Sequence, residues 1–235
     1  MIELWGSSTP NVQKVILALE ELETPYKMIY VDLLTHEETA PKFATLTHNR
    51  KAPVIVDLDG PGGEPLTVWE SGAILFYLAE KFGRFFPDDG SGRYHTMQWL
   101  MFQMSGIGPM FGQHVHFTRY APEQEYSRSR YTTELKRLYD VVERRLAESR
   151  YLAGDEYTIA DIATWPVIQN LEFRGVRGED LPNVVRWADE ISRRPAVVRT
   201  KDVVAGIPRQ DVDQLLKNKP DVMDRYFGRG RYARA

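Results

Sequence analysis

The first residues whose types could do chemistry are Ser7-Ser8-Thr9-Pro10-Asn11, close to the N-terminus. Thr9 suits the N-cap of a helix, and Pro10 suits the first helical position. A helix start carries unpaired N–H donors and about half a positive charge, which favour a bound thiolate over a thiol. Asn11 could add its side-chain amide as a donor to sulfur. The sequence leaves open whether this segment only caps a helix or also stabilises a thiolate.

The sulfur atom of such a site would have to come from a ligand, because the chain contains no cysteine. This absence also excludes disulfides and any cysteine-ligated metal. A thiol with a pKa near ~8.5 is only a few per cent ionised at neutral pH. A shift of about two units would make the thiolate the majority form.

A second segment, Asn49-Arg50-Lys51-Ala52-Pro53-Val54, places a proline at the start of an expected strand, directly after a basic loop. One interpretation is an edge-strand proline beside a solvated basic loop. The other is a cis Ala52–Pro53 bond, which would turn the backbone N–H and C=O of Ala52 toward a peptide-like ligand. Only ~5 to 6% of X–Pro bonds are cis, so the sequence does not decide between the two.

A third segment is Trp69-Glu70-Ser71-Gly72-Ala73, in which Ser71 could cap a helix. Capping is again a sufficient explanation. The same residues would also suit the α-amino-acid end of a ligand. Glu70 would attract its ammonium group, and the hydroxyl and N–H of Ser71 would bind its carboxylate.

The pattern of apolar and turn residues in 1–83 predicts the elements that position these segments, in the order β-α-β-α-β-β-α. The expected ranges are strand 2–5, helix 12–22, strand 26–33, a helical turn at 41–46, strands 54–57 and 65–69, and helix 70–82. The helix between the first two strands indicates a parallel β-α-β unit, and the last two strands read as a hairpin.

Beyond the Pro-, Asp- and Gly-rich segment 87–92, the pattern is helical. Apolar spacing predicts helices around 94–104, 131–146 and 184–191, with an interruption at Gly106-Ile107-Gly108-Pro109. Thr158-Ile159-Ala160-Asp161 fits the acidic variant of a capping box. We therefore predict four segments: domain 1–84, linker 85–92, helical domain 93–205 and a solvated C-terminal extension 206–235.

The composition narrows the class of partner. Thirty Lys and Arg against 33 Asp and Glu give a net charge of -3, which argues against nucleic acid or an anionic membrane as the partner. No apolar run approaches the ~18 to 20 residues of a spanning helix, and the start lacks a basic leader. The expectation is a soluble, cytoplasmic protein with a small-molecule partner.

Taken together, the ordered motifs resemble those of the glutathione transferase superfamily over about the first 200 residues. They are Ser-x-Pro-Asn, Lys-Ala-Pro-Val, Glu-Ser-Gly-Ala-Ile and Thr-Ile-Ala-Asp. Gly106–Met110 and Gly112–Phe117, together with Thr9-Pro10-Asn11, are most similar to the bacterial nu class. The resemblance implies an N-terminal thioredoxin-like α/β domain followed by an all-helical C-terminal domain, usually in a homodimer.

The resemblance also implies glutathione as substrate and a glutathione-dependent disulfide-bond oxidoreductase or transferase activity. It assigns Thr9 and Asn11 to the sulfur, Lys51 to the glycyl carboxylate, Ala52 and Pro53 to the cysteinyl backbone, and Glu70 and Ser71 to the γ-glutamyl end. Such relatives can bind two glutathione molecules or oxidised glutathione. Arg130, with Arg128 as the alternative, would hold the second molecule.

Several points stay open. Other classes place the sulfur-binding hydroxyl two residues before the proline, which makes Ser8 the alternative to Thr9. Nu-class relatives often carry glutamine where this chain has Glu38, so a ligand contact from that carboxylate is in question. A non-catalytic glutathione-binding regulator and a conjugating or dehalogenating transferase that uses Ser8 are the alternative functions.

The expected pocket for the second substrate contains His114, Phe117 and Tyr131. His114 and His116 also raise the question of a metal site. Residues two apart on a helix point to opposite sides, and no third ligand is evident, so no metal is expected.

Overall fold

The computed structural model describes residues 1–32, 40–88 and 90–208. Glu38 and residues 209–235, which form most of the expected C-terminal extension, lie outside these ranges.

The N-terminal part is built on a four-stranded sheet in the order β2-β1-β3-β4. The strands are β1 (Ile2–Gly6), β2 (Tyr26–Tyr30), β3 (Val54–Asp57) and β4 (Leu66–Trp69). β1 and β2 are parallel, whereas β3 is antiparallel to both β1 and β4. The expected β-α-β unit and hairpin are therefore confirmed, although β2 ends three residues earlier than predicted.

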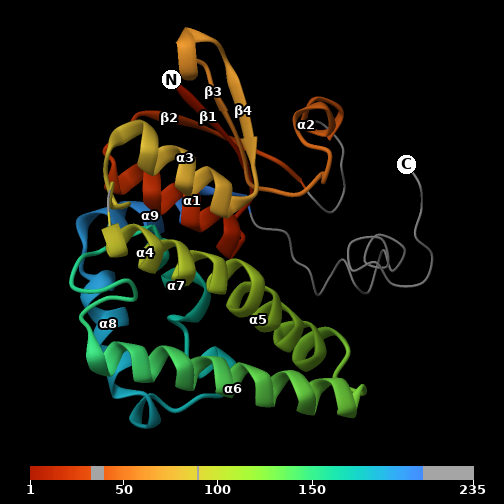
Figure 1. The fold of residues 1–235 in the computed structure, drawn as a ribbon. Helices are drawn as coiled ribbons and strands as arrows, with labels where there is room; N and C mark the ends of the chain where they lie inside the picture. Colours follow the sequence, from red (N-terminus) through yellow and green to blue (C-terminus); the bar gives the residue numbers. More distant parts are fainter. Residues whose placement is uncertain (33–39, 89, 209–235) are drawn as a thin grey trace.

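Helices cover both faces of this sheet (Figure 1). α1 (Pro10–Glu21) and α3 (Ser71–Phe82) lie between the sheet and the helical part of the chain. α1 forms because Val12, Val15, Ile16 and Leu19 recur at helical spacing, and all four are buried. α2 (Ala40–Leu46) packs on the opposite face, where its Phe43 belongs to a small apolar cluster with Trp5, Val31 and Val54.

The rest of the described chain is helical. Its elements are α4 (Gly90–Phe102), the π-helix η2 (Gln103–Ile107), α5 (Gly108–Val115), the π-helix η3 (His116–Tyr120), α6 (Glu125–Glu148), α7 (Ile159–Ile168), α8 (Pro182–Ser192) and α9 (Pro195–Gly206). Short 3-10 turns occupy Pro61–Gly63, Glu172–Arg174 and Gly178–Asp180. The thioredoxin-like domain followed by an all-helical domain is confirmed, although α4 begins inside the expected linker.

The interruption expected at 106–109 is present as a π-helix that begins three residues earlier, and not as a break in the helical chain. The chain passes from α4 through the π-helix Gln103–Ile107 directly into α5. Pro109 is the second residue of α5, which directly follows the π-helical turn. Single π-helical turns inside longer helices often occur at functional sites.

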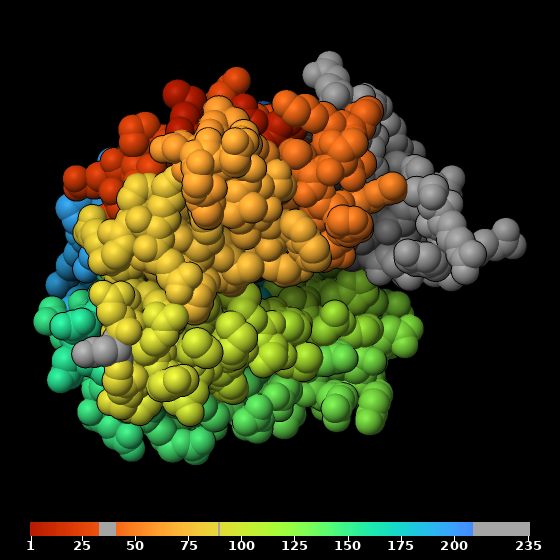
Figure 2. Space-filling view, turned by 45° about the horizontal axis from the view of Figure 1, so that its top comes forward, coloured from red at the N-terminus to blue at the C-terminus, as the bar shows by residue number. Residues whose placement is uncertain are grey.

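The two parts pack closely against each other (Figure 2). α1 contacts both α7 and α9, and the guanidinium of Arg194, just before α9, makes two bonds to the carboxylate of Glu21 in α1. Buried residues of the sheet, α1, α3 and the helical part belong to one continuous apolar cluster. Among the described helices, none has both the length and the apolar character needed to cross a membrane.

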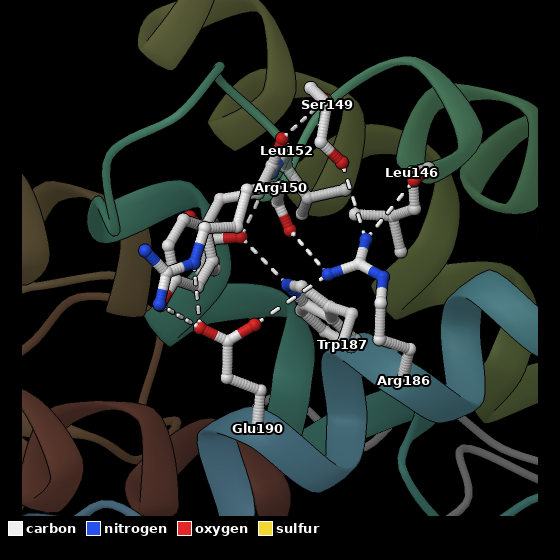
Figure 3. Close-up of polar contacts among 9 residues, drawn as sticks. Leu146, Ser149, Arg150, Leu152, Arg186, Trp187 and Glu190 are labelled. Atoms are coloured by element: carbon white, nitrogen blue, oxygen red, sulfur yellow. Dashed lines mark hydrogen bonds and ion pairs between the residues drawn. The ribbon is translucent and has the colours of Figure 1, made fainter.

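A polar network joins the end of α6, the connection to α7 and the helix α8 (Figure 3). The expected capping box is confirmed, because the Thr158 hydroxyl accepts from the Ala160 N–H and the Asp161 carboxylate accepts from the Thr158 N–H. Asp161 also accepts bonds from the N–H of Leu152 and from Nε1 of Trp187, at 3.0 and 2.9 Å. Burial raises the pKa of Asp161 to about 6, although these hydrogen bonds act to lower it.

The end of α6 is held by the same network. Arg186 donates to the carbonyl oxygens of Leu146, Ser149 and Arg150, which satisfies acceptors that a helix end leaves unpaired. Glu190 accepts from the guanidinium of Arg150, and its Oε1 lies 2.7 Å from the hydroxyl of Tyr151.

Candidate functional site

The three segments singled out in the sequence meet in one cleft of about 290 Å³. The sheet register brings them together, because Trp5 pairs with Val54 and Val54 pairs with Trp69. The end of β1, the start of β3 and the end of β4 therefore lie side by side at the same end of the sheet. The cleft is lined by Thr9, Asn11, Asn49, Lys51, Ala52, Pro53, Glu70 and Ser71.

Thr9 occupies the N-cap of α1, as expected, but its side chain does not cap the helix. Its backbone carbonyl accepts from the N–H groups of Val12 and Gln13, each at 3.0 Å, so the first turn is bonded through the backbone. The prediction of a capping hydroxyl is thus wrong. The threonine side chain instead lies in the wall of the cleft, next to the positive end of the helix.

Ser8, the alternative to Thr9, is not among the residues that line this cleft. Its carbonyl oxygen accepts a hydrogen bond from Nε2 of Gln13 at 2.9 Å. Asn11, by contrast, lines the cleft together with Thr9. The geometry therefore favours Thr9 and Asn11 as the groups that would meet a bound sulfur atom.

The Ala52–Pro53 peptide bond is cis, as the second interpretation of that segment predicted. Lys51, Ala52 and Pro53 all line the cleft. Asn49, which the sequence reasoning left without a role, lies there too and donates from Nδ2 to Oε1 of Glu70 at 3.2 Å. Its position beside the basic loop was visible in the sequence, but its contact with a residue 21 positions away was not.

Glu70 has an unusual backbone, with φ 71° and ψ 120°, just before α3. A non-glycine residue in such a conformation costs roughly 1 to 3 kcal/mol, and such residues cluster at ligand-binding sites. Ser71 is the first residue of α3 and makes no capping bond, so the predicted cap is wrong. Its hydroxyl instead lies 3.7 Å from the sulfur of Met104, at the boundary with the helical part.

Lys14 and Gln103 form a buried contact that the sequence reasoning missed. Nζ of Lys14 donates to Oε1 of Gln103 at 2.9 Å, which links α1 to the π-helix η2. Burial lowers the pKa of Lys14 to about 7, whereas the nearby charge of Glu70 raises it. The available signal was helical phase, because Lys14 lies three and four positions before the buried Leu17 and Ala18.

A second cavity of about 480 Å³ lies on the helical part. It is lined by Met110, Tyr126, Ser129, Arg130, Tyr131, Thr133 and Glu134. Two of the predicted residues, Arg130 and Tyr131, are thus in its wall, and Phe117 stacks on Tyr131 with ring centroids 5.4 Å apart.

His114 does not line this cavity. Its ring is buried, and Nδ1 lies 3.3 Å from the hydroxyl of Thr132. Burial lowers the pKa of His114, and the positive charge of Arg174 lowers it further. The ring of His116 packs against Phe117. In the described ranges, no three His, Cys, Asp or Glu residues are grouped as a metal ion would require.

The fold and the cleft define a class of protein: a thioredoxin-like domain with a ligand cleft at its helix starts, joined to a helical domain. Family models agree with this description. Residues 1–80 match the glutathione S-transferase N-terminal domain, and residues 125–190 match the glutathione S-transferase C-terminal domain.

Individual relatives agree as well. Disulfide-bond oxidoreductase YfcG of Escherichia coli (strain K12) is 44% identical over 198 residues, which cover 83% of this chain and 92% of YfcG. A glutathione transferase from Burkholderia graminis, solved with two glutathione molecules bound per subunit, is 46% identical with a TM-score of 0.81, over 86% of this chain and 87% of that one. One from Pseudomonas putida, solved with one glutathione disulfide per subunit, is 42% identical with a TM-score of 0.79, over 85% and 90%.

The chain belongs to the glutathione S-transferase family. The resemblance to its bacterial members of the disulfide-bond reductase type is also confirmed.

Proposed function

We propose that this protein is a glutathione-dependent disulfide-bond oxidoreductase that also has glutathione transferase chemistry. The observation that carries the proposal is the convergence of three distant segments on one cleft at the start of α1. The cleft combines neutral donors at a helix start, a backbone edge and a carboxylate beside a second helix start. These groups complement a thiolate, a peptide backbone and a zwitterionic end, all of which glutathione carries.

In the proposed binding mode, glutathione lies across the cleft with its sulfur at Thr9 and Asn11. The N–H and C=O of Ala52 pair with the cysteinyl backbone, and Lys51 meets the glycyl carboxylate. At the other end, Glu70 binds the ammonium group, and Ser71 binds the γ-glutamyl carboxylate. The helix starts and the neutral donors favour the thiolate over the thiol.

The reaction then needs no protein cysteine. The glutathione thiolate attacks one sulfur of the substrate disulfide, the S–S bond breaks, and the other sulfur leaves as a thiolate that takes up a proton. A second glutathione thiolate attacks the resulting mixed disulfide. The products are oxidised glutathione and two substrate thiols, so the two electrons come from the two glutathione molecules.

The second glutathione would bind at the cavity on α6. Arg130 lies in its wall and would meet a carboxylate, while Tyr131, stacked on Phe117, would offer an apolar side. The homodimer and the cytoplasmic location remain predictions.

The test is turnover of a small disulfide and of an aryl halide by the wild type and by Thr9→Ala, Asn11→Ala and Ser8→Ala. We expect disulfide turnover to fall at least tenfold in Thr9→Ala and Asn11→Ala, because each removes a donor to the thiolate. Ser8→Ala should stay close to the wild type.

Two outcomes would overturn the proposal. Tight binding of oxidised glutathione without turnover of either substrate would make the protein a non-catalytic regulator. Loss of activity in Ser8→Ala alone would move the sulfur site to Ser8 and favour a conjugating or dehalogenating transferase.

A further inference from the structure

Lys14 is an ionisable residue that is buried among the apolar residues of α1. It lies on α1 only four residues after Pro10 and is 1% exposed. A helix rises about 1.5 Å per residue, so Lys14 is roughly 6 Å along the axis from the helix start that borders the cleft. Burying an ammonium group is costly, and such groups are retained where a partner or a function compensates.

Its hydrogen-bond partner is neutral. Nζ donates to Oε1 of Gln103, a residue with 0% exposure at the first position of the π-helix η2. Within the described part of the chain, the Nε2 group of Gln103 is buried and has no hydrogen-bond partner. The contact therefore holds the ammonium in place without cancelling its charge.

The other charges around α1 are engaged elsewhere. At the opposite end of the helix, Glu21 is paired with Arg194 and Glu20 with Arg199. On α7, the carboxylate of Asp161 is bonded to the capping box and to Trp187.

At the far end of α3, Lys81 is paired with Asp57. Among the described residues, Glu70 in the wall of the cleft carries the charge that raises the pKa of Lys14. Lys14 is thus coupled electrostatically to the ligand cleft and not to the ion pairs that join the two parts.

We propose that Lys14 is a positioning residue whose buried ammonium, held by Gln103, favours the anionic form of the glutathione sulfur at the start of α1. This inference rests on the proposed function. Lys14 lies about one helical turn from the start of α1, its protonated form adds a positive charge to the half charge of the helix dipole, and it acts from the protein interior, where screening by water is weak.

The coupling works in both directions. An anion bound at the cleft stabilises the protonated lysine, and the protonated lysine stabilises the anion by the same free energy. Burial lowers the pKa of Lys14 to about 7, so its charge responds to a neighbouring anion at neutral pH. For charges on the order of 10 Å apart at an effective dielectric constant of about 20, the shift in thiol pKa is about one unit.

The experiment is a pH titration of the thiolate absorbance of glutathione bound to the full-length protein. Two variants change the buried charge in different ways. Lys14→Met removes the positive charge but keeps the length of the side chain, while Gln103→Glu keeps an acceptor for Lys14 and neutralises its charge. Lys27→Met is the matched control, because it removes one positive charge from an exposed position on β2.

We expect the thiol pKa to rise by about one unit in both Lys14→Met and Gln103→Glu, so that the thiolate fraction at neutral pH falls several-fold. Lys27→Met should match the wild type. If Lys14→Met does not fold, Gln103→Glu carries the test, because it retains the hydrogen bond.

Unchanged thiol pKa values in both variants would overturn the inference and leave the proposed function intact. A rise in Lys14→Met alone would indicate lost packing and would also overturn it. Absence of a bound thiolate in the wild type would overturn both the inference and the proposed function.

Discussion

The cleft at the start of α1 and the polar network at the end of α6 use similar residues in opposite ways. In the network, Asp161 and Arg186 direct their polar atoms at backbone groups and at Trp187, and the Asp161 carboxylate is fully buried. In the cleft, Glu70 is exposed and sits on a strained backbone, and the Thr9 side chain does not cap its helix. Polar groups saturated by the protein hold the fold, whereas polar groups left facing a cleft are available to a ligand.

Removing Asp161 should give the largest effect on stability. Asp161→Ala leaves the buried N–H groups of Leu152, Thr158 and Trp187 without an acceptor, and we expect a loss of about 3 to 4 kcal/mol in unfolding free energy. Urea unfolding measures this loss. Asp155→Ala, an exposed carboxylate on the same connection, should change stability by no more than about 0.5 kcal/mol. Equal losses in the two variants would contradict this account of the network.

Lys14 is buried like the polar network but lies next to the cleft. Its contribution to the free energy of unfolding should depend on pH. The unfolded chain keeps this lysine protonated up to its ordinary pKa of 10.5, whereas the folded protein releases the proton near pH 7. Raising the pH from 7 to 10 therefore removes a cost of folding. The unfolding free energy of the wild type should rise relative to Lys14→Met by about 2 to 4 kcal/mol.

The measurement is urea unfolding of both proteins at several pH values. Lys27→Met, compared with the wild type in the same way, should give a difference that does not vary with pH. Parallel curves for Lys14→Met and the wild type would show that the lysine is not destabilised by burial.

Glu70 should show the smallest effect on stability together with a clear effect on binding. Glycine adopts φ near 70° without strain, so Glu70→Gly should leave the unfolding free energy unchanged or raise it by about 1 kcal/mol. Loss of the carboxylate should weaken binding of oxidised glutathione at least tenfold in calorimetry.

Glu70→Ala is the matched variant, because it loses the same carboxylate but keeps the strained conformation. It should lose affinity equally and gain no stability. A stable Glu70→Gly protein with wild-type affinity would remove Glu70 from the site.

Much of the fold could be predicted from local patterns. Helical spacing located α1, turn residues separated β3 from β4, and the Thr158–Asp161 spacing specified the capping box. These signals work because caps, turns and amphipathic helices depend on neighbours a few residues apart. The same locality limits what could be predicted at Gly106–Pro109, where glycine and proline indicate an interruption but not that it takes the form of a π-helix.

The sequence alone also selected most of the residues that line the cleft, since Thr9, Asn11, Ala52, Pro53, Glu70 and Ser71 stand in recognisable segments. It did not decide how they act. Whether the Thr9 hydroxyl caps α1 or faces the cleft depends on the side-chain orientation in the folded protein, and the position of Ser8 outside the cleft lining depends on the path of the chain into α1.

Only the tertiary structure revealed the Lys14–Gln103 contact, whose partners are 89 residues apart. Helical phase places Lys14 beside apolar residues of α1, but whether its ammonium reaches solvent or is enclosed is set by the helices that pack against α1. The sequence therefore determined which local elements form and which groups could meet a peptide-like ligand. The packing of the two parts decided which of those groups face the cleft, and it placed the buried charge of Lys14 next to them.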